Sequence, residues 1–413
     1  MENTQDILLE RFLRYVKTWT ESNSENADKG IQPSSPMQTD FAKELEKELK
    51  SIGITDIFVS EHAYVCARLP ATKGYENFPS VGFLAHMDTV DEVTGKNVNP
   101  QVFKNYDGGV LNIGNGILLD PAKDNDLKVS VGETIITTDG TTLLGADDKA
   151  GIAAIMTAME SIIKDNIPHG QIEVIFSPDE ETGHGMDNVP VDWIQSKQCY
   201  TLDGGHIGEL EVECFTAFKS DVTFTGVSTH TGTARATMVN SITMLSAFVN
   251  FLPQTESPEA TDGYQGFYAP MQISGGIEQS YLQIFNRDFT MEKMQRRLDA
   301  IDTFAKAIEA KFPGGKVDVK HTKQYVNMKE KLDENPLVVE KLTQAVKNLG
   351  ITPVFNPIRG GTDGSRLTEM GIPTPNVFTG GHNFHSRSEW ASLNQMEAST
   401  KTVIELVRLW AEA

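Results

Sequence analysis

The stretch LGADDKAGIAAIMTAMESIIKDNIPHGQIEVIFS, residues 144–177, predicts a helix followed by a buried strand. Residues 171–177, QIEVIFS, contain a run of apolar side chains, as in strands that are covered on both faces. A long helix next to such a strand indicates an α/β core. Apolar side chains recur at helical spacing in the first half and predict one buried helix face, made by Ile152, Ile155, Met156, Met159 and Ile162.

Similar elements are predicted on both sides of this stretch. Before it we expect helices at 7–16 and 41–52, short strands in FVSE, AYVCARL and SVGFLAH, an irregular region at 91–130, and a hairpin-like turn at Asp139-Gly140. Near the C-terminus, Asn335 and Pro336 begin a helix that ends before Gly350. The alternation of strands and helices resumes there and finishes with a helix at 393–411.

The pattern changes near residue 214. VECFTAFKSDVTFTGV alternates like antiparallel strands, a helix is expected in SITMLSAFVNFL, and two more strands in MQISGG and SYLQIFNRDF. A helix at 291–311 and the strand VDVKHTKQY complete a β-β-α-β-β-α-β order, which is typical of an α+β unit with a half-exposed sheet. We therefore predict three segments: catalytic domain at 1–214, an inserted lid domain at 215–325, and the rest of the catalytic domain at 326–413.

Composition excludes several classes of partner. The chain has 413 residues, more than one ordinary domain needs, and a formal net charge of −21. So much negative charge argues against nucleic acid and against anionic membrane surfaces. Three cysteines without CxxC spacing, and an N-terminus without a signal-like apolar segment, favour a cytoplasmic protein. The cysteines are interpreted as small buried residues: Cys66, Cys199 and Cys214.

Acidic and histidine side chains recur where predicted strands end. His86 and Asp88 follow one apolar strand and share a face, because residues two apart in a strand point the same way. Asp147 and Asp148 begin a helix, where the helix dipole favours carboxylates. Open α/β sheets build their sites at such strand ends. Further candidates follow other apolar runs or lie in a Gly-rich loop: Asp179, Glu180, Glu181, Asp203, His382 and His385.

This set of side chains suits a pair of metal ions. One neutral histidine per metal together with shared carboxylates matches the ligand preferences of Zn²⁺. Two metals about 3.5–4 Å apart can share a hydroxide and lower its pKa. Of the adjacent Glu180 and Glu181, one carboxylate can bind metal while the other acts as a general base.

The motifs also resemble a known family. HMDT, TTDGTTLLGADDKAGIA, SPDEETG, TLDGG, PIRGGTDGSRL and FTGGHNFHS are similar to motifs of the co-catalytic two-zinc metallopeptidases related to aminoacylases and glutamate carboxypeptidases, and in particular to their tripeptide aminopeptidases. The resemblance covers nearly the whole chain. It implies a phosphorylase/hydrolase-like α/β core, with a mixed sheet flanked by helices, and an inserted ferredoxin-like lid domain.

The resemblance implies a role for each matching residue. One zinc ion is expected at His86, Asp147 and Asp203 and the other at Asp147, Glu181 and His385, with Asp147 bridging and followed by a cis peptide. Asp88 is expected to orient His86. A bridging hydroxide, activated by Glu180, is expected to attack the peptide, and Glu180 then passes a proton to the leaving amine.

Four other residues match positions that contact the substrate in relatives. They are His230, Asn240, Arg287 and Arg359. The planar fork of an arginine suits a substrate carboxylate, and the alternative for Arg287 is an ordinary ion pair with Asp288 or another neighbour. His382 lies where relatives often have Tyr and is interpreted as a loop residue, and the other histidines as surface or turn residues: His62, His169, His184, His206 and His321.

The expected activity is removal of the N-terminal residue from short peptides with a free N-terminus. A dipeptidase, carboxypeptidase or aminoacylase with the same metal ligands remains the alternative, and a non-catalytic peptide-binding protein is a more distant one. The protein is expected to be a monomer or a homodimer. The polar segment Thr18–Gln38 departs from the family and is either a surface loop or part of the rim of the substrate cleft.

Overall fold

The computed structural model describes residues 4–412, which form two compact units. The larger unit comprises Met1–Val212, Glu330–Asn356 and Thr362–Ala413, and the smaller one Glu213–Lys329 and Pro357–Gly361. The segment Pro357–Gly361 lies far along the sequence from the rest of the smaller unit. It joins that unit because Ile358 pairs with Cys214 in a β-bridge, and because its amide N–H donates to the carbonyl oxygen of Glu213.

The core of the larger unit is an eight-stranded mixed sheet. Its strand order is β1-β2-β8-β3-β9-β16-β10-β15. β3 is parallel to both β8 and β9, and β9 is parallel to β16, whereas β1, β2 and β10 introduce antiparallel pairs. The bounds are β1 Asp56–Val59, β2 Val65–Leu69, β3 Val81–His86, β8 Ile172–Ser177, β9 Cys199–Gly204, β10 Glu209–Glu211, β15 Val354–Phe355 and β16 Asn376–Phe378.

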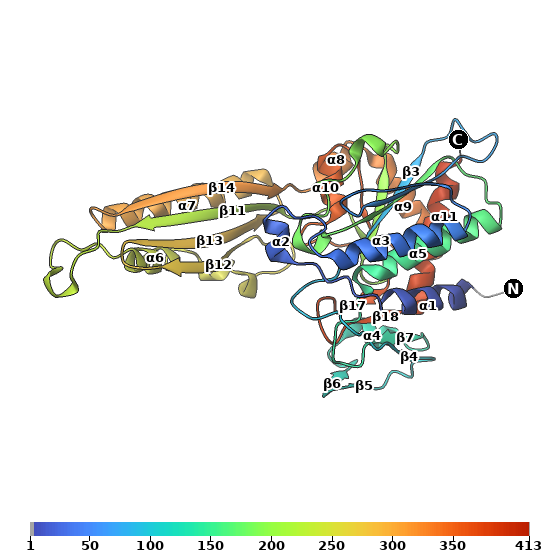
Figure 1. The fold of residues 1–413 in the computed structure, drawn as a ribbon, viewed down its shortest axis with the longest axis horizontal. Coiled ribbons are helices and arrows are strands. Elements are labelled where there is room, and N and C mark those ends of the chain that lie inside the picture. The colour runs from blue at the N-terminus through green and yellow to red at the C-terminus, as the bar shows by residue number, and fades with distance from the viewer. Residues whose placement is uncertain (1–3, 413) are drawn as a thin grey trace. The chain divides into compact units, whose positions relative to one another are not determined.

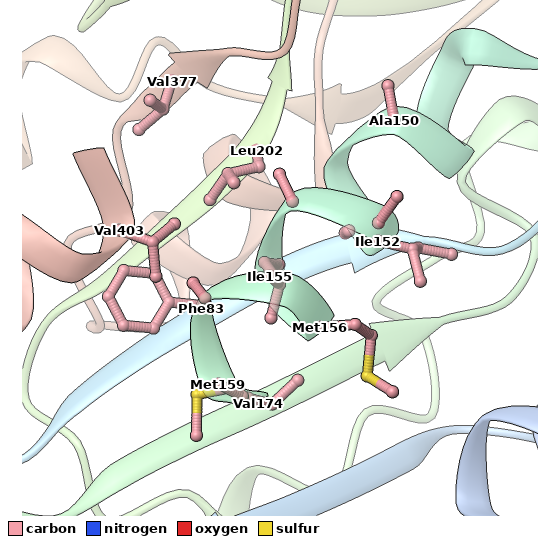
Figure 2. Packing of buried hydrophobic residues seen from close by; sticks show 14 of the residues in the cluster. Phe83, Ala150, Ile152, Ile155, Met156, Met159, Val174, Leu202, Val377 and Val403 are labelled. Carbon is pink, nitrogen blue, oxygen red and sulfur yellow. The ribbon is translucent and has the colours of Figure 1, made fainter. Parts of the chain in front are cut away.

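Both faces of this sheet are covered, which explains the apolar runs of β3 and β8. Phe83 and Val174 belong to the cluster that includes α5, whereas their neighbours Leu84 and Ile175 pack with Leu367 of α10 on the other face. Figure 2 shows the first cluster, in which Met156 and Met159 of α5 lie against the strands. The helices of the larger unit are α1 Thr4–Tyr15, α2 Ser24–Asp28, α3 Pro36–Ser51, α4 Asn125–Val129, α5 Ala146–Lys164, α8 Lys329–Asp333, α9 Pro336–Asn348, α10 Asp363–Glu369 and α11 Leu393–Trp410.

The sequence predicted the long helices of this unit closely. α3 begins five residues before the predicted start, because Ser35 is its N-cap residue and Pro36 is its first residue. Figure 1 shows α1 beside α5, and the buried Arg11 joins them by donating to Thr157 and Glu160 while it also pairs with Glu48 of α3. The three cysteines are free and buried, as predicted.

The region expected to be irregular between residues 91 and 130 contains short elements. Its strands β4, β5 and β6 belong to two further sheets, which have the orders β17-β18-β7-β4 and β5-β6. Strands this short carry too few residues to show an alternating pattern in the sequence. Their bounds are β4 Gln101–Phe103, β5 Leu111–Gly114, β6 Ile117–Leu119, β7 Ile135–Thr137, β17 Gly381–His382 and β18 Trp390–Ser392.

The smaller unit is a four-stranded antiparallel sheet with two helices, α6 and α7 (Figure 1). The strand order β12-β13-β11-β14 with the chain order β-α-β-β-α-β is the ferredoxin-like arrangement. Both helices share one apolar cluster with alternate residues of β11 and β13, such as Val222 and Leu282, so they cover one face of the sheet. The bounds are β11 Thr216–Thr225, α6 Ser241–Val249, β12 Phe267–Gly275, β13 Gln279–Asp288, α7 Met291–Lys311 and β14 Lys316–Tyr325.

One prediction for this unit was wrong. The alternating stretch at 212–227 was expected to form two strands, but the structure has the single ten-residue strand β11. No turn interrupts the alternation, and β11 pairs along its length with both β13 and β14. Over residues 4–412, no helix is both long and apolar enough to cross a membrane.

A close contact between α5 and β9 positions the start of the helix. Gly151 lies where a Cβ atom would collide with the carbonyl oxygen of Leu202 and with the carboxylate of Asp148. Only glycine therefore allows α5 to approach β9 so closely, next to Asp203.

We predict that Gly151→Ala destabilises the larger unit. The added methyl group must separate α5 from β9, and overpacking of this kind costs about 1–3 kcal/mol. Thermal unfolding should show a melting temperature several degrees lower than that of the wild type. Gly276→Ala is the matched control, because a Cβ there meets nothing within 4 Å. Equal melting temperatures for the two variants would contradict the packing argument.

Candidate active site and metal centre

The candidate residues lie at one edge of the large sheet. His86 is the last residue of β3, Asp203 lies near the end of β9, and Glu180 and Glu181 follow β8. These three strands are parallel neighbours, so their carboxyl ends lie together. Asp147 lies at the start of α5, and its peptide bond to Asp148 is cis, as the resemblance implied.

Asp147 lies between two histidines that are far apart in the sequence. Its Oδ1 is 2.8 Å from Nε2 of His86, and its Oδ2 is 3.2 Å from Nε2 of His385. Two more carboxylates complete the cluster. Asp203 Oδ1 is 3.5 Å from His86 Nε2, and Glu181 Oε2 is 3.0 Å from His385 Nε2. The five residues predicted as metal ligands thus form one continuous cluster.

The cluster holds more negative than positive charge in a buried place. Burial, followed by the charge of Asp147, raises the pKa of Glu181 to about 8, and burial raises the pKa of Asp203 to about 6. Burial would also raise the pKa of Asp147, but contacts with His385 and His86 lower it below its ordinary value. For His385, burial lowers the pKa, yet hydrogen bonds with Asp147 and Glu181 raise it to about 11. Carboxylates in this state are stabilised by added cations.

The donor atoms fit metal ions. His86, Asp147 and Glu181 each place one donor atom within 4.8 Å of the others, as do His86, Asp148 and Asp203. Within the described part of the chain, Oε1 of Glu181 is buried without a hydrogen-bond partner, so it has a free lone pair for a cation. Imidazole nitrogens mixed with carboxylate oxygens suit Zn²⁺.

Asp148 differs from the other acids in this cluster. Its carboxylate accepts hydrogen bonds from the backbone N–H groups of His86 and Gly151, at 3.1 and 3.2 Å. Burial, followed by the charge of Asp203, raises its pKa well above the ordinary value. Asp148 therefore links the end of β3 to the first turn of α5 through the backbone.

Asp88 is fully buried and lies beneath the turn that carries the two glutamates. Its two carboxylate oxygens accept from the backbone N–H groups of Glu180 and Glu181, at 3.0 and 3.2 Å. Nδ1 of His86 lies 3.1 Å from the carbonyl oxygen of Asp88 and 3.4 Å from its Oδ1. Asp88 thus contacts His86, as the sequence interpretation expected, and it also orients the Glu180–Thr182 turn, which that interpretation missed.

Glu180, the predicted general base, lies in this 3-10 turn. Burial is the largest cause that raises the pKa of its carboxyl group well above the ordinary value. The charge of His86 partly opposes the rise, and the charges of Asp203 and Asp363 add to it.

The sequence interpretation also missed Glu389. Its buried carboxylate accepts from three backbone N–H groups in the loop that carries Asp147: those of Leu144, Gly145 and Asp147, at 2.7, 2.8 and 3.1 Å. It therefore fixes the path of the chain at the start of α5. No local pattern around Glu389 points to this contact, because the partners are about 240 residues away.

The polar segment Thr18–Gln38 contributes to the same network. Asp179, next to Glu180, accepts from the backbone N–H of Ser34 at 2.8 Å and from Nε2 of Gln38 at 2.6 Å, and it also hydrogen-bonds the Ser34 hydroxyl. The backbone N–H of Asp179 donates to Gln38 Oε1 at 3.0 Å. The segment is therefore more than a surface loop, because it holds the residue that precedes Glu180.

The four predicted substrate-contacting residues all lie in the smaller unit. His230 is exposed, and Asn240 caps α6 by accepting from the backbone N–H of Ile242. Arg287 is buried and donates to Phe218, Asn286 and Gln324, and the neighbouring Asp288 pairs with Arg297 instead. Arg359 donates to the carbonyl oxygens of Thr261, Gly263 and Gln265, so it holds that loop.

Comparison with known proteins agrees with the motifs and the fold. Residues 138–409 match the family described as Peptidase family M20/M25/M40. A Peptidase T from Clostridium perfringens is 45% identical over 98% of each chain. Among solved structures, the aminopeptidase PepT from Bacillus cereus has a TM-score of 0.76 at 24% identity over 99% of each chain. A tripeptidase from Staphylococcus aureus has a TM-score of 0.78 at 22% identity over 98% of each chain.

These findings confirm the resemblance inferred from the motifs and the mixed α/β fold that it implied. The chain belongs to peptidase family M20/M25/M40 and is a metallopeptidase.

Proposed function

We propose that this peptidase removes the N-terminal residue from tripeptides in the cytoplasm, at a centre that holds two zinc ions. The proposal rests on the contacts of Asp147. Its two carboxylate oxygens contact two different histidines, in a cluster that has more carboxylates than histidines. One carboxylate shared by two imidazoles suits a pair of metal ions that it bridges. Free buried cysteines support the cytoplasmic assignment.

The proposed ligands divide into two groups around Asp147. His86, Asp147 and Asp203 hold one ion, and Asp147, Glu181 and His385 hold the other. When bound, the two ions would supply Lewis-acid polarisation of the substrate carbonyl and would lower the pKa of the attacking water. The backbone contacts of Asp88 and Glu389 keep the ligand-bearing loops in place.

Glu180 acts as the general base in this proposal. It takes a proton from the attacking water and later delivers it to the nitrogen of the leaving amine. A buried carboxyl group with a raised pKa suits both steps, because it accepts a proton more readily than an exposed carboxylate and can still pass the proton to the more basic leaving amine. Asp88 assists by orienting the backbone of the turn that carries Glu180.

Substrate recognition is assigned to the smaller unit. Arg287 is the strongest of the four candidates, since the adjacent Asp288 pairs with Arg297 and not with Arg287. A buried guanidinium that donates to neutral acceptors, as that of Arg287 does, can bind the carboxylate of a short peptide. His230, Asn240 and Arg359 are proposed to contact the rest of the peptide. The tripeptide assignment itself is supported by the names of the relatives, Peptidase T and tripeptidase.

We predict that Glu180→Gln lowers kcat about 10²–10⁴-fold, because the amide cannot take up a proton. Zinc content should stay at the wild-type value, since Glu180 is not among the proposed ligands. The measurements are steady-state hydrolysis and metal analysis of the same preparation. Glu340→Gln, on an exposed part of α9, is the control and should leave kcat unchanged. Full activity in Glu180→Gln would exclude this residue as the base.

Peptide length and N-terminal charge should decide the substrate. Zinc-loaded protein is expected to cleave the first residue from tripeptides with a free amine and to leave matched dipeptides, tetrapeptides and N-acetylated tripeptides intact, with products identified by mass. Cleavage of dipeptides or N-acyl compounds would retain the metal chemistry and replace the substrate assignment with dipeptidase or aminoacylase. Release of the C-terminal residue would indicate a carboxypeptidase.

Removal of the shared ligand should remove both ions of this centre. We predict that Asp147→Asn loses two equivalents of zinc relative to the wild type and has no measurable hydrolysis, because each ion loses its bridging carboxylate. Chelation of the wild type should have the same effect on activity, and added zinc should reverse it. Asp192→Asn, an exposed aspartate, serves as the control. A loss of one equivalent or none would contradict the bridging role.

A further inference from the structure

A second cluster of ligand-type side chains lies apart from the residues assigned to the zinc pair. Asp126 of α4, His206 after β9 and His382 of β17 each place a donor atom within 4.8 Å of the others. Nδ1 of His206 is 3.6 Å from Oδ1 of Asp126, and Nδ1 of His382 is 3.4 Å from Oδ2 of the same carboxylate. The sequence interpretation treated both histidines as non-ligands. His382, expected to be a loop residue, is a buried strand residue in the structure.

The surroundings of His382 fix which ring nitrogen carries its proton. Nε2 of Gln395 donates to the Glu133 carboxylate at 3.2 Å and lies 3.4 Å from the Ser130 hydroxyl. Oε1 of Gln395 therefore faces the other way, where it accepts from the backbone N–H of Ile207 at 3.1 Å and lies 3.2 Å from Nε2 of His382. Since Oε1 only accepts, Nε2 of His382 must carry hydrogen. In the neutral ring, the lone pair of Nδ1 then points towards Asp126.

His206 presents a similar atom to the same carboxylate. Among residues 4–412, its Nδ1 is a buried atom without a hydrogen-bond partner. A nitrogen lone pair that faces a carboxylate oxygen is repelled unless a cation lies between them. A cation at this place, either a proton or a metal ion, would therefore be stabilised by the two histidines and Asp126.

The separations favour a metal ion over a proton. A charge-assisted hydrogen bond between imidazolium and carboxylate has a heavy-atom distance of about 2.7–2.9 Å, shorter than either separation here. Ligand atoms about 2.0–2.2 Å from a tetrahedral Zn²⁺ are about 3.3–3.6 Å apart. The separations of 3.4 Å from His382 to Oδ2 and 3.6 Å from His206 to Oδ1 of Asp126 each have the length of such a ligand–ligand edge.

We propose that Asp126, His206 and His382 bind an additional zinc ion, distinct from the proposed pair. Two imidazole nitrogens and one carboxylate group are a common Zn²⁺ ligand set, and water can occupy a further position. Asp126 is half exposed, with 49% of its side chain accessible, so the ion can enter from solvent. Gln395 orients His382 through the nitrogen that does not face the site, as hydrogen-bonded partners of metal ligands do.

The site is held in place by contacts that do not need the ion. Asp124 caps α4 by accepting from the backbone N–H groups of Asp126 and Leu127, and its Oδ2 accepts from Trp390 Nε1 at 3.0 Å. The ring of Trp390 stacks on His382, with centroids 3.9 Å apart and an interplanar angle of 16°. The ligand on α4 and the ligand on β17 are therefore positioned by one shared network.

The consequence of binding is structural. His206 lies three residues after Asp203, and His382 lies three residues before His385, so each is close in the chain to a proposed ligand of the zinc pair. An ion held by both histidines joins these two segments to each other and to α4. The additional ion thereby limits the movement of two ligand-bearing segments without contacting the substrate.

The test compares zinc content after chelation, reloading with zinc chloride and removal of free metal. We expect His206→Ala to contain one equivalent less than the wild type, and Asp126→Asn, which keeps the side-chain volume, to show the same loss. His184→Ala removes a histidine that pairs with Asp187 on the surface and should lose none. Cobalt added to the Asp147→Asn protein should give the visible absorption band of a tetrahedral site. The band should be absent from the double variant that also carries His206→Ala.

The outcomes separate this proposal from the proposed function. Unchanged zinc content in both His206→Ala and Asp126→Asn would overturn the additional site, whatever the state of the zinc pair. Asp147→Asn measures the pair, so its failure to lose zinc would contradict the pair and leave the additional site supported by the His206→Ala difference. If His206→Ala does not fold, Asp126→Asn replaces it in both the zinc and the cobalt measurement, because Asp126 is half exposed. A cobalt spectrum in Asp147→Asn without a tetrahedral band would favour a protonated histidine pair over a metal ion.

Discussion

The structure depends on a concentration of buried negative charge at the carboxyl edge of one sheet. Asp88, Asp147, Asp148, Glu180, Glu181 and Asp203 lie there, and the imidazoles of His86 and His385 contact Asp147, Glu181 and Asp203 among these carboxylates. Burial raises the pKa of Glu181 to about 8 because an uncompensated carboxylate is poorly solvated in this place. Folding tolerates such an arrangement only if cations or oriented dipoles stabilise it. The fold supplies the dipoles, and the ligand set is suited to metal cations.

Backbone N–H groups provide much of that stabilisation. Asp88 binds the amides of Glu180 and Glu181, Asp148 binds those of His86 and Gly151, and Glu389 binds those around Asp147. Each of these acids joins two elements that carry site residues, so their charges are stabilised while the site becomes rigid. Two further contacts support the same rigid site. α5 approaches β9 closely at Gly151, and the segment Thr18–Gln38 hydrogen-bonds Asp179.

The proposed additional zinc site lies on segments that continue from the same cluster. The two segments that end the cluster, after Asp203 and before His385, also carry His206 and His382. Gln395 accepts from the residue after His206 and from His382, so a single buried amide organises both segments. The proposed metal ligands and the neutral Gln395 amide therefore both stabilise the segments after Asp203 and before His385. The smaller unit, in contrast, is an ordinary antiparallel sheet whose stability comes from the apolar cluster beneath α6 and α7.

The sequence by itself determined the elements with long local patterns. α7 has the predicted bounds, and the two-sided burial of β3 and β8 follows from their apolar runs. The five proposed ligands lie in short motifs that resemble those of the family. The single long strand β11 was missed because an alternating pattern does not show how many strands a stretch forms. The short strands between residues 101 and 119 were missed because an alternating pattern cannot be recognised over so few residues. Only the tertiary structure decided the contacts of Glu389, the second role of Asp88, and the meeting of His206 with His382. These contacts join segments that are distant in the chain, and their distances follow from how the sheet and helices pack.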